Sequence, residues 1–401
     1  MKTRSVLFLF FLLSLILSSC YIGRFFYWNF ADINDYKKFK FLDVKKPDVP
    51  FTFLKSTKGQ ALDSIKYNGV KYQLDDFVEY NKSVAFLIIR NDTILYEKYF
   101  QGRNQESYVP SFSAAKSFLS ALVGIAISDG SIKSVNQPIT DYLPELKTND
   151  ERFSKITIEH LLNMRSGILF KESYFNPFGN VAKSYYGRNL IGQLKTLKIK
   201  SEPDKEFEYI SENTQLLAFI VERATEKKIP EYLQEKIWKL LGMEYDATWS
   251  IDSKGRNEAK AFCCLNACAR DYAKFGRLFL NGGKWNGQQI IPEDWVKKST
   301  TVDQNTKDLY YTYQWWHNAE WIRLSDTSKV SSIDSSHIET STSKDGKKAR
   351  YLLKPKHDFF ADGFLGQFIY VYPSKNIIIV RLGKEAKVRW PKIFLSIAQQ
   401  L

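Results

Sequence analysis

A serine and a lysine lie three residues apart where a polar stretch of the chain gives way to an apolar one. Ser113 and Lys116 belong to the run Ser111-Phe-Ser-Ala-Ala-Lys-Ser117, and residues 118–127 are mostly apolar. Positions three residues apart share one face of a helix, so the hydroxyl and the amine would lie side by side. A serine hydroxyl needs a base to act as a nucleophile, and burial favours the neutral, basic form of a lysine. The spacing therefore predicts a covalent hydrolase with Ser113 as nucleophile and Lys116 as base.

This spacing is weak evidence when it stands alone. Ser341-Thr-Ser-Lys344 repeats it in a polar stretch ahead of Asp345-Gly346, where nothing would bury the lysine, so we interpret that copy as chance. An ordinary helix cap followed by a solvated lysine is the alternative interpretation of Ser113 and Lys116 themselves. Two further segments decide between these interpretations. They are Tyr209-Ile-Ser-Glu-Asn-Thr-Gln-Leu-Leu217 and Gly363-Phe-Leu-Gly-Gln-Phe-Ile-Tyr-Val371.

In this order along one chain, the three segments resemble the motifs of the serine β-lactamase and penicillin-binding protein superfamily. The closest resemblance is to its class C-like esterase and amidohydrolase branch, which includes 6-aminohexanoate-oligomer hydrolases. It extends from about residue 83 to the C-terminus, and residues 160–167, 266–276 and 313–316 are similar to the family's connecting segments. The resemblance implies that the phenol of Tyr209 works with Lys116 in moving protons. Ser211 occupies a position where relatives often carry asparagine.

The third segment departs from the family pattern. Relatives that process β-lactams usually carry Lys-Thr-Gly there, whereas this chain has Phe364-Leu365-Gly366. Phenylalanine and leucine offer neither a charge nor a donor to a substrate carboxylate. Gly366 still permits close approach of the backbone, and the N–H of Gln367 can complete an oxyanion hole with that of Ser113. These features favour an ester or a linear amide as substrate.

The four histidines are rival candidates for the base. His160 lies within an expected short helix and is interpreted as structural. His317, His337 and His357 have no metal-ligand partners at a recognisable spacing, and the chain contains no Gly-x-Ser-x-Gly elbow. A distant Ser-His-Asp triad stays open at this point. We expect neither a metal ion nor an organic cofactor.

The N-terminus resembles a bacterial lipoprotein signal. Lys2 and Arg4 precede an apolar run that ends in Leu17-Ser-Ser-Cys20, and this run is short for a membrane span. We expect a signal peptide at 1–19, lipidation of Cys20, an anchor and lead-in segment at 20–80, and a hydrolase domain at 81–401. Ordinary cleavage near Cys20 is the alternative. The predicted location is the bacterial cell envelope, with the chain lipid-anchored and facing the periplasm or exterior.

Charge and cysteine content restrict the partners. The chain has 58 Lys and Arg against 44 Asp and Glu, a formal charge of +14. A basic chain raises the question of nucleic acid, but the lysines are scattered, so anionic lipids or wall polymers are the more plausible partners. Cys263, Cys264 and Cys268 are expected to be small buried thiols, because adjacent cysteines rarely bridge and no zinc-ligand spacing exists. The sequence does not fix the oligomeric state.

Strand patterns near both ends of the hydrolase region enclose a mostly helical middle. Residues 83–100 and 367–382 each predict a hairpin, and residues 391–400 predict a closing helix. The predicted fold is α+β: a β-lactamase/transpeptidase-like antiparallel sheet flanked by helices, with an inserted, mostly helical lobe. The periodic segments predict a helix that begins with Ser113 in its first turn and ends at Asp129-Gly130, and further helices at 157–164, 213–225, 230–241, 269–280 and 292–298, whereas 301–362 is expected to be irregular.

The sequence thus predicts a membrane-anchored serine hydrolase that acts on a small or peptide-like ester or amide. Two alternatives remain at this stage. One is a D-alanyl carboxypeptidase or β-lactamase that acts on substrates like those of the cell wall and takes its carboxylate-binding cation from elsewhere. The other is a non-catalytic lipoprotein that binds wall fragments.

Overall fold

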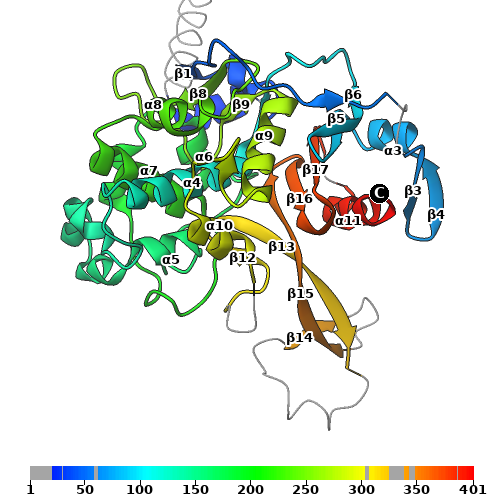
Figure 1. Cartoon of the computed structure of the whole chain (residues 1–401). Helices are drawn as coiled ribbons and strands as arrows, with labels where there is room; N and C mark the ends of the chain where they lie inside the picture. Colours follow the sequence, from blue (N-terminus) through cyan, green and yellow to red (C-terminus); the bar gives the residue numbers. More distant parts are fainter. Residues whose placement is uncertain are drawn as a thin grey trace, which may run out of the picture. The chain divides into compact units, whose positions relative to one another are not determined.

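The computed structural model describes residues 20–28, 30–57, 62–302, 307–324, 338–342, 348–385 and 387–401 (Figure 1). The chain forms two compact units. Unit 1 comprises residues up to 45 together with 108–236 and 246–267, and unit 2 comprises 46–107, 237–245 and 268–401. Among the described helices, none combines the length and apolar character that crossing a bilayer requires. The predicted signal peptide, 1–19, lies outside the described residues.

Unit 2 is built on a nine-stranded sheet. Its strands, in chain order, are β2 (Leu54–Lys55), β5 (Ser83–Arg90), β6 (Thr93–Tyr99), β12 (Tyr311–Thr312), β13 (Trp315–Arg323), β14 (Ile338–Thr342), β15 (Lys348–Gly363), β16 (Gln367–Tyr372) and β17 (Ile377–Gly383). Their order across the sheet is β12-β13-β15-β16-β17-β5-β6-β2, with β14 paired to β15. The two predicted hairpins are confirmed, and β17 pairs antiparallel with β5, which joins the ends of the hydrolase region in one sheet.

Helices cover both faces of this sheet. Because successive strand residues point to opposite faces, alternate residues of β16 and β17 meet different helices. Ile369, Val371 and Ile378 face Gly276 of α9 (Ala269–Leu280), where a side chain larger than hydrogen would collide with two of them. The intervening residues join the core cluster that contains Trp390 and Phe394 of α11 (Trp390–Gln400). Unit 2 also contains α3 (Leu74–Tyr80), α10 (Glu293–Thr300), the strand pairs β3 (Ser64–Tyr67) with β4 (Val70–Gln73) and β10 (Lys284–Trp285) with β11 (Gln288–Gln289), and the 3₁₀ turn η10 (Pro373–Lys375).

Unit 1 is mostly helical around a small sheet. The sheet runs β1 (Lys40–Val44), β8 (Ala247–Ile251), β9 (Leu265–Ala267) and β7 (Val109–Pro110). The α-helices are α2 (Tyr21–Trp28), α4 (Ala115–Ser128), α5 (Ile158–Leu162), α6 (Asn180–Tyr186), α7 (Ser211–Thr225) and α8 (Ile229–Leu233). Short helical turns connect them: η1 (Asp35–Lys37), η2 (Phe112–Ala114), η3 (Ile139–Asp141), η4 (Pro144–Thr148), η5 (Glu151–Lys155) and η6 (Ile191–Thr196).

Helix α4 forms the centre of unit 1. Twelve of its residues, Ala115 through Ala126, are buried, which is what the apolar run after Lys116 demands of a soluble fold. It packs against α7, so the segment that begins with Tyr209 and Ser211 lies beside the start of α4. The predicted α+β class is confirmed, with the helical residues concentrated in unit 1 and the large antiparallel sheet in unit 2.

Two expectations about secondary structure are wrong. The segment 301–362 contains the long strands β13 and β15, although their outer halves are exposed and lack the alternation that would have indicated strands. The helix expected at 230–241 ends early: α8 stops at Leu233 and a π-helical turn, η7 (Gln234–Trp238), follows. Residues 20–80 include α2, β1 and α3, and β1 pairs with β8; the domain boundaries drawn from the sequence stay a prediction.

Candidate active site

Ser113 occupies a tight turn immediately before α4. It is the middle residue of η2, and the preceding Phe112 has φ of +43°, a left-handed conformation that is strained for a large side chain. The turn is fixed to the small sheet because the N–H of Ser111 donates to the carbonyl of Leu265 over 2.7 Å. Phe112 and Ala114 are buried, whereas Ser113 is partly exposed. Ser113 is therefore the residue of this turn whose side chain remains partly accessible.

Lys116 lies directly beside this hydroxyl, as the spacing predicts. Its side chain is 1% exposed. The Nζ atom donates to Ser113 Oγ at 2.9 Å, to the Phe262 carbonyl at 2.9 Å and to Ser211 Oγ at 3.4 Å. Burial lowers the pKa of Lys116 to about 8, against an opposing effect of the Glu172 carboxylate, which raises it. With such a pKa, roughly a tenth of the amine is neutral at pH 7 and can accept a proton from Ser113.

Tyr209 and Ser211 complete this cluster from the N-terminal end of α7. Lys116 Nζ lies 5.1 Å from the centre of the Tyr209 ring, over its face. Ser211 is 2% exposed and contacts Lys116 through its hydroxyl. The structure thus brings together Ser113, Lys116, Tyr209 and Ser211, four of the residues predicted from the sequence.

Two residues that the sequence analysis missed contact this cluster. The Glu172 carboxylate accepts hydrogen bonds from Ser211 Oγ at 2.6 Å and from the Ser211 N–H at 2.8 Å. Tyr174 donates to Glu172 at 2.9 Å and is also hydrogen-bonded to the Ser113 side chain. Burial and then the Glu172 charge raise the pKa of Tyr174, so its phenol stays protonated and able to donate. Both residues belong to an irregular segment between Gly167 and α6, where periodicity offers no signal.

The third segment is held in a defined turn within unit 2. Gly366, with φ of +81°, ends the turn between β15 and β16, and a Cβ there would lie 2.0 Å from Nη1 of Arg381. That same nitrogen donates to the carbonyls of Leu365 and Gly366 at 3.1 and 2.7 Å. The side-chain amide of Gln367 donates to the Gly383 carbonyl at 2.7 Å and accepts from the Gly383 N–H at 3.0 Å. Ser113 belongs to unit 1, so the pairing of its N–H with that of Gln367 in an oxyanion hole stays a prediction.

His160 caps a helix and His317 is buried, whereas His357 is exposed in β15. His160 and Thr157 form a reciprocal cap at the start of α5, in which each backbone N–H donates to the other side chain. His317 is buried in β13, and burial lowers its pKa to about 3. His337 lies outside the described residues. Within the described part of the chain, no group of three or more His, Cys, Asp and Glu side chains is arranged to hold a metal ion.

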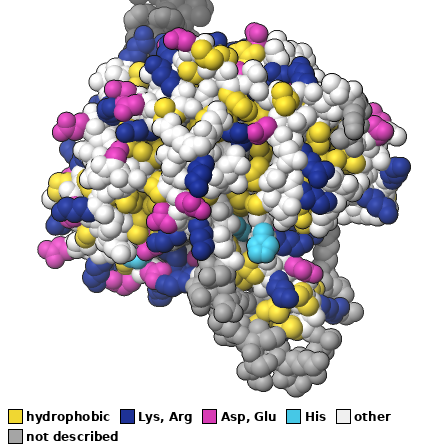
Figure 2. Space-filling model, in the orientation of Figure 1, with side chains coloured by type: hydrophobic (Ala, Val, Ile, Leu, Met, Phe, Trp, Pro, Cys, Tyr) yellow, Lys and Arg dark blue, Asp and Glu magenta, His cyan; other side chains and the backbone are white. Residues whose placement is uncertain are grey.

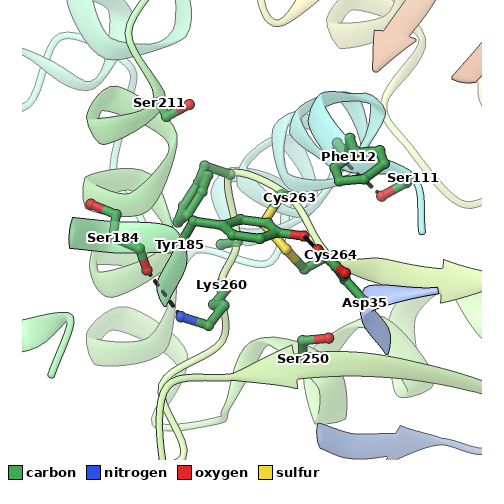
Figure 3. The surroundings of a disulfide bond; sticks show 12 residues. Asp35, Ser111, Phe112, Ser184, Tyr185, Ser211, Ser250, Lys260, Cys263 and Cys264 are labelled. Atoms are coloured by element: carbon green, nitrogen blue, oxygen red, sulfur yellow. Dashed lines mark hydrogen bonds between the residues drawn. A yellow bond between two sulfur atoms is a disulfide. The ribbon is translucent and has the colours of Figure 1, made fainter. Parts of the chain in front are cut away.

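The expectation of free thiols is wrong for two of the three clustered cysteines. Cys263 and Cys264 form a disulfide, shown in Figure 3 beside Lys260 and Ser250, whereas Cys268 is a buried free thiol as expected. Adjacent cysteines can bridge only where the backbone leaves its usual conformation, and Cys264 does so with φ of +75°. The disulfide directly follows Phe262, whose carbonyl binds Lys116.

This arrangement unites a nucleophile, a base of lowered pKa and hydroxyl groups able to relay protons, which is the chemistry of a serine hydrolase. A sequence profile of the Beta-lactamase family matches residues 75–393. The chain is therefore a member of the β-lactamase family of serine hydrolases.

Individual relatives agree with this assignment. The chain is 29% identical to a 6-aminohexanoate-dimer hydrolase of Paenarthrobacter ureafaciens over 265 residues, which cover 61% of this chain and 66%, just under two thirds, of that enzyme. A solved structure of a Bacillus anthracis protein, itself proposed to be a 6-aminohexanoate-dimer hydrolase, superimposes with a TM-score of 0.74 at 24% identity, covering 93% of each chain. A penicillin-binding protein from Bacillus halodurans gives a TM-score of 0.58 at 17% identity, covering 83% of this chain and all of that one. These structural likenesses show the shared fold.

Proposed function

We propose that the protein cleaves an ester or a linear amide through an acyl-enzyme on Ser113. The neutral Lys116 amine takes the Ser113 proton as Oγ attacks the substrate carbonyl. The proton then passes to the leaving group, with the Tyr209 phenol assisting, and a water molecule releases the acyl group by the reverse path. The single observation that carries this proposal is the 2.9 Å contact between a buried Lys116 Nζ and Ser113 Oγ.

The oxyanion that forms during attack needs backbone donors. We assign these to the N–H groups of Ser113 and Gln367. Loss of one such donor costs on the order of 100- to 1000-fold in rate, so the turn that carries Gln367 matters for activity as well as for folding. Arg381, which binds two carbonyls of that turn, is its main support.

The preference for an ester or a linear amide rests on two observations. Phe364 and Leu365 replace the cation and hydroxyl that would bind the carboxylate of a β-lactam or D-alanyl substrate. In addition, the similar Paenarthrobacter protein is named for a linear amide substrate, the 6-aminohexanoate dimer. The alternative, a D-alanyl carboxypeptidase or β-lactamase, is supported only by the shared fold. Turnover of a chromogenic cephalosporin would favour that alternative, whereas turnover limited to short-chain esters or linear amides favours ours.

We further propose that the chain is lipid-anchored in the bacterial envelope through Cys20. The sequence Leu17-Ser-Ser-Cys20 supports this part of the proposal, and Cys20 is exposed at the start of α2. A diacylated cysteine there would hold unit 1 at a membrane surface.

A fluorophosphonate probe tests the nucleophile directly. The folded protein should be labelled once, and peptide mapping should place the label on Ser113. Ser113→Ala should abolish labelling and reduce ester turnover by at least 1000-fold. Ser111→Ala is the matched control, since Ser111 is buried in the same turn with its hydroxyl bonded to the Phe112 carbonyl, and it should keep the label. An unlabelled but folded wild-type protein would favour the non-catalytic binding lipoprotein.

A further inference from the structure

Unit 1 contains a cavity that is separate from the predicted catalytic residues. Its volume is about 280 Å³, and it is lined by Arg24 and Trp28 of α2, by Gly187 and Arg188 after α6, and by Asp252 after β8. None of the predicted catalytic residues lines it. Pockets for whole drug-sized ligands start near 300 Å³, so this cavity suits a compact group such as a phosphate with its neighbouring atoms.

The charges around the cavity are strongly unbalanced. Five basic residues line it, Arg24, Lys38, Lys40, Arg188 and Lys254, against the single carboxylate of Asp252. Asp252 already accepts hydrogen bonds from the backbone N–H groups of Leu190 and Glu258, and Lys38 pairs with Asp35 at 2.7 Å. Within the part of the chain that the structure describes, Lys40, Arg188 and Lys254 form no ion pair with a carboxylate. The cavity therefore carries an excess of positive charge.

Two buried cations, Arg24 and Lys260, lie in or next to the wall of the cavity. Arg24 is 4% exposed and donates to the Tyr186 carbonyl at 2.7 Å; burial and then the nearby Arg188 charge lower its pKa. Lys260 is fully buried and donates to the carbonyl of Ser184 (Figure 3) and to that of Gly187. Burial is the main reason that the pKa of Lys260 is lowered to about 7; the Asp252 carboxylate opposes this shift, and the Arg24 charge adds a smaller lowering effect. A bound anion would relieve the repulsion among these cations.

The cavity also lies next to the proposed membrane anchor. Helix α2 begins at the residue after Cys20, and it supplies both Arg24 and Trp28 to the cavity wall. Its aromatic residues Phe26 and Tyr27 are 65% and 82% exposed. Exposed aromatic side chains beside basic ones are typical of segments that lie at a membrane–water interface.

A second aromatic contact extends this surface. Phe30, just beyond α2, lies with its ring centre 5.8 Å from that of Phe175, and Phe175 is itself 69% exposed. The exposed aromatic residues therefore come from two chain segments of unit 1 that contact each other.

We propose that this cavity binds the phosphate of an anionic glycerophospholipid in the membrane to which the chain is anchored. The guanidinium groups of Arg24 and Arg188 provide paired donors that suit a phosphodiester, and the exposed aromatic residues Phe26, Tyr27, Phe30 and Phe175 lie at the level of the headgroups. The occupant is a lipid headgroup that orients unit 1 on the bilayer; it takes no part in the hydrolysis. This inference rests on the proposed function, because the proposed lipid anchor at Cys20 determines where the membrane lies.

Native mass spectrometry of the full chain in nonionic detergent tests the proposal. All variants carry Cys20→Ser, so the result does not depend on whether lipidation occurs. Equal amounts of phosphatidylglycerol and phosphatidylcholine are added, and the phospholipid retained per chain is counted. We expect one phosphatidylglycerol per chain, retained at least tenfold more than phosphatidylcholine.

The cavity variant combines Lys40→Gln, Arg188→Gln and Lys254→Gln, all at exposed positions. Each basic side chain near an anionic surface contributes roughly fivefold, so we expect the loss of three to lower phosphatidylglycerol binding by about 100-fold. The matched control, Lys147→Gln, Lys195→Gln and Lys205→Gln, removes the same charge from exposed positions of unit 1 outside the cavity and should bind like the parent.

Equal losses in both triple variants, or equal retention of the two phospholipids, would overturn the proposal. Displacement of the lipid by inorganic phosphate at similar concentration would also overturn it, because the site would then prefer a free anion.

Discussion

At the scale of single residues, the chemistry depends on how the environment of Lys116 differs from water. Its aliphatic stem is buried in α4, and its amine meets a hydroxyl, a carbonyl and a second hydroxyl. The charge of the Glu172 carboxylate opposes the loss of its proton. Ser211, which relatives often replace by asparagine, is short enough for its hydroxyl and N–H to hold both oxygens of Glu172. Glu172 is therefore a positioning residue that also sets the basicity of Lys116.

Glu172→Gln tests this role. The Glu172 charge raises the pKa of Lys116, so its removal should lower that pKa below about 8 and shift the ascending, acid-side limb of the pH–rate profile to lower pH. The measurement is kcat/KM for an ester substrate between pH 5 and 10. Glu202→Gln, an exposed carboxylate that pairs with Lys155, is the control and should leave the profile in place. An unshifted profile in Glu172→Gln would contradict the assignment.

The sequence could predict some of these residues and not others. Ser113, Lys116, Tyr209 and Ser211 belong to ordered motifs, so residue type and spacing indicated them. The Phe262 carbonyl is a backbone group, and no residue type at that position reveals it. Glu172 and Tyr174 lie in an irregular segment whose position depends on its contacts with Ser211 and Ser113.

At the scale of elements, two turns matter for the proposed chemistry: η2 of unit 1, which carries Ser113, and the β15–β16 turn of unit 2, which precedes Gln367. Each contains residues of positive φ, Phe112 in the first and Leu365 with Gly366 in the second. Such conformations persist only where the surroundings hold them. The hydrogen bond from Ser111 to β9 does so for η2, and Arg381 does so for the second turn.

Gly366→Ala should impair activity more than stability. The added Cβ would meet Arg381 Nη1 at 2.0 Å and displace the turn that carries the Gln367 N–H, so we expect kcat to fall by at least 100-fold. Gly130→Ala is a close control, since Gly130 has the same φ of +81° but open space around its Cβ position. Backbone strain should cost Gly130→Ala about 1 kcal/mol of stability, measured by urea unfolding, and Gly366→Ala at least as much because it also collides with Arg381; only Gly366→Ala should lose activity. Equal activity in the two variants would argue against the oxyanion role of Gln367.

The elements that the sequence predicted are those with strong local patterns. Strands β5, β16 and β17 are buried on both faces and rich in β-branched residues, and α9 ends where its periodicity ends. Strands β13 and β15 were missed because their outer halves pair with one another in the open, where no hydrophobic alternation is required. Local patterns likewise carry no signal for the π-helical turn after α8 or for the disulfide at Cys263.

At the scale of the whole molecule, the charge of the chain is consistent with the proposed anchor at a membrane. Lys and Arg side chains are interspersed with Asp and Glu over the visible face in Figure 2, as the scattered lysines of the sequence suggest. The net charge of +14 would draw such a protein toward anionic membrane surfaces. Five of the basic residues line the cavity to which α2, the helix that follows Cys20, contributes.

Cys20→Ser tests the anchor itself. In bacteria that produce the full chain, we expect the parent to partition into the detergent phase of a Triton X-114 extract and its N-terminal peptide to carry a diacylglyceryl mass. Cys20→Ser should lose that mass, because the thiol is the attachment atom. Cys268→Ala, which removes the buried free thiol, should retain it. An unmodified Cys20 peptide in the parent would rule out the anchor while leaving the hydrolase chemistry untouched.

The transfer of a proton from Ser113 to a buried amine is the central claim, and the pH dependence of fluorophosphonate labelling measures it most directly. In the wild-type protein, the labelling rate should rise with pH and level off around a midpoint near 8, the pKa that burial gives Lys116. Lys116→Arg, which keeps a cation that does not deprotonate, should react at least 1000-fold more slowly and without that midpoint. A flat wild-type profile, or a Lys116→Arg variant that labels as fast as the parent, would contradict the account.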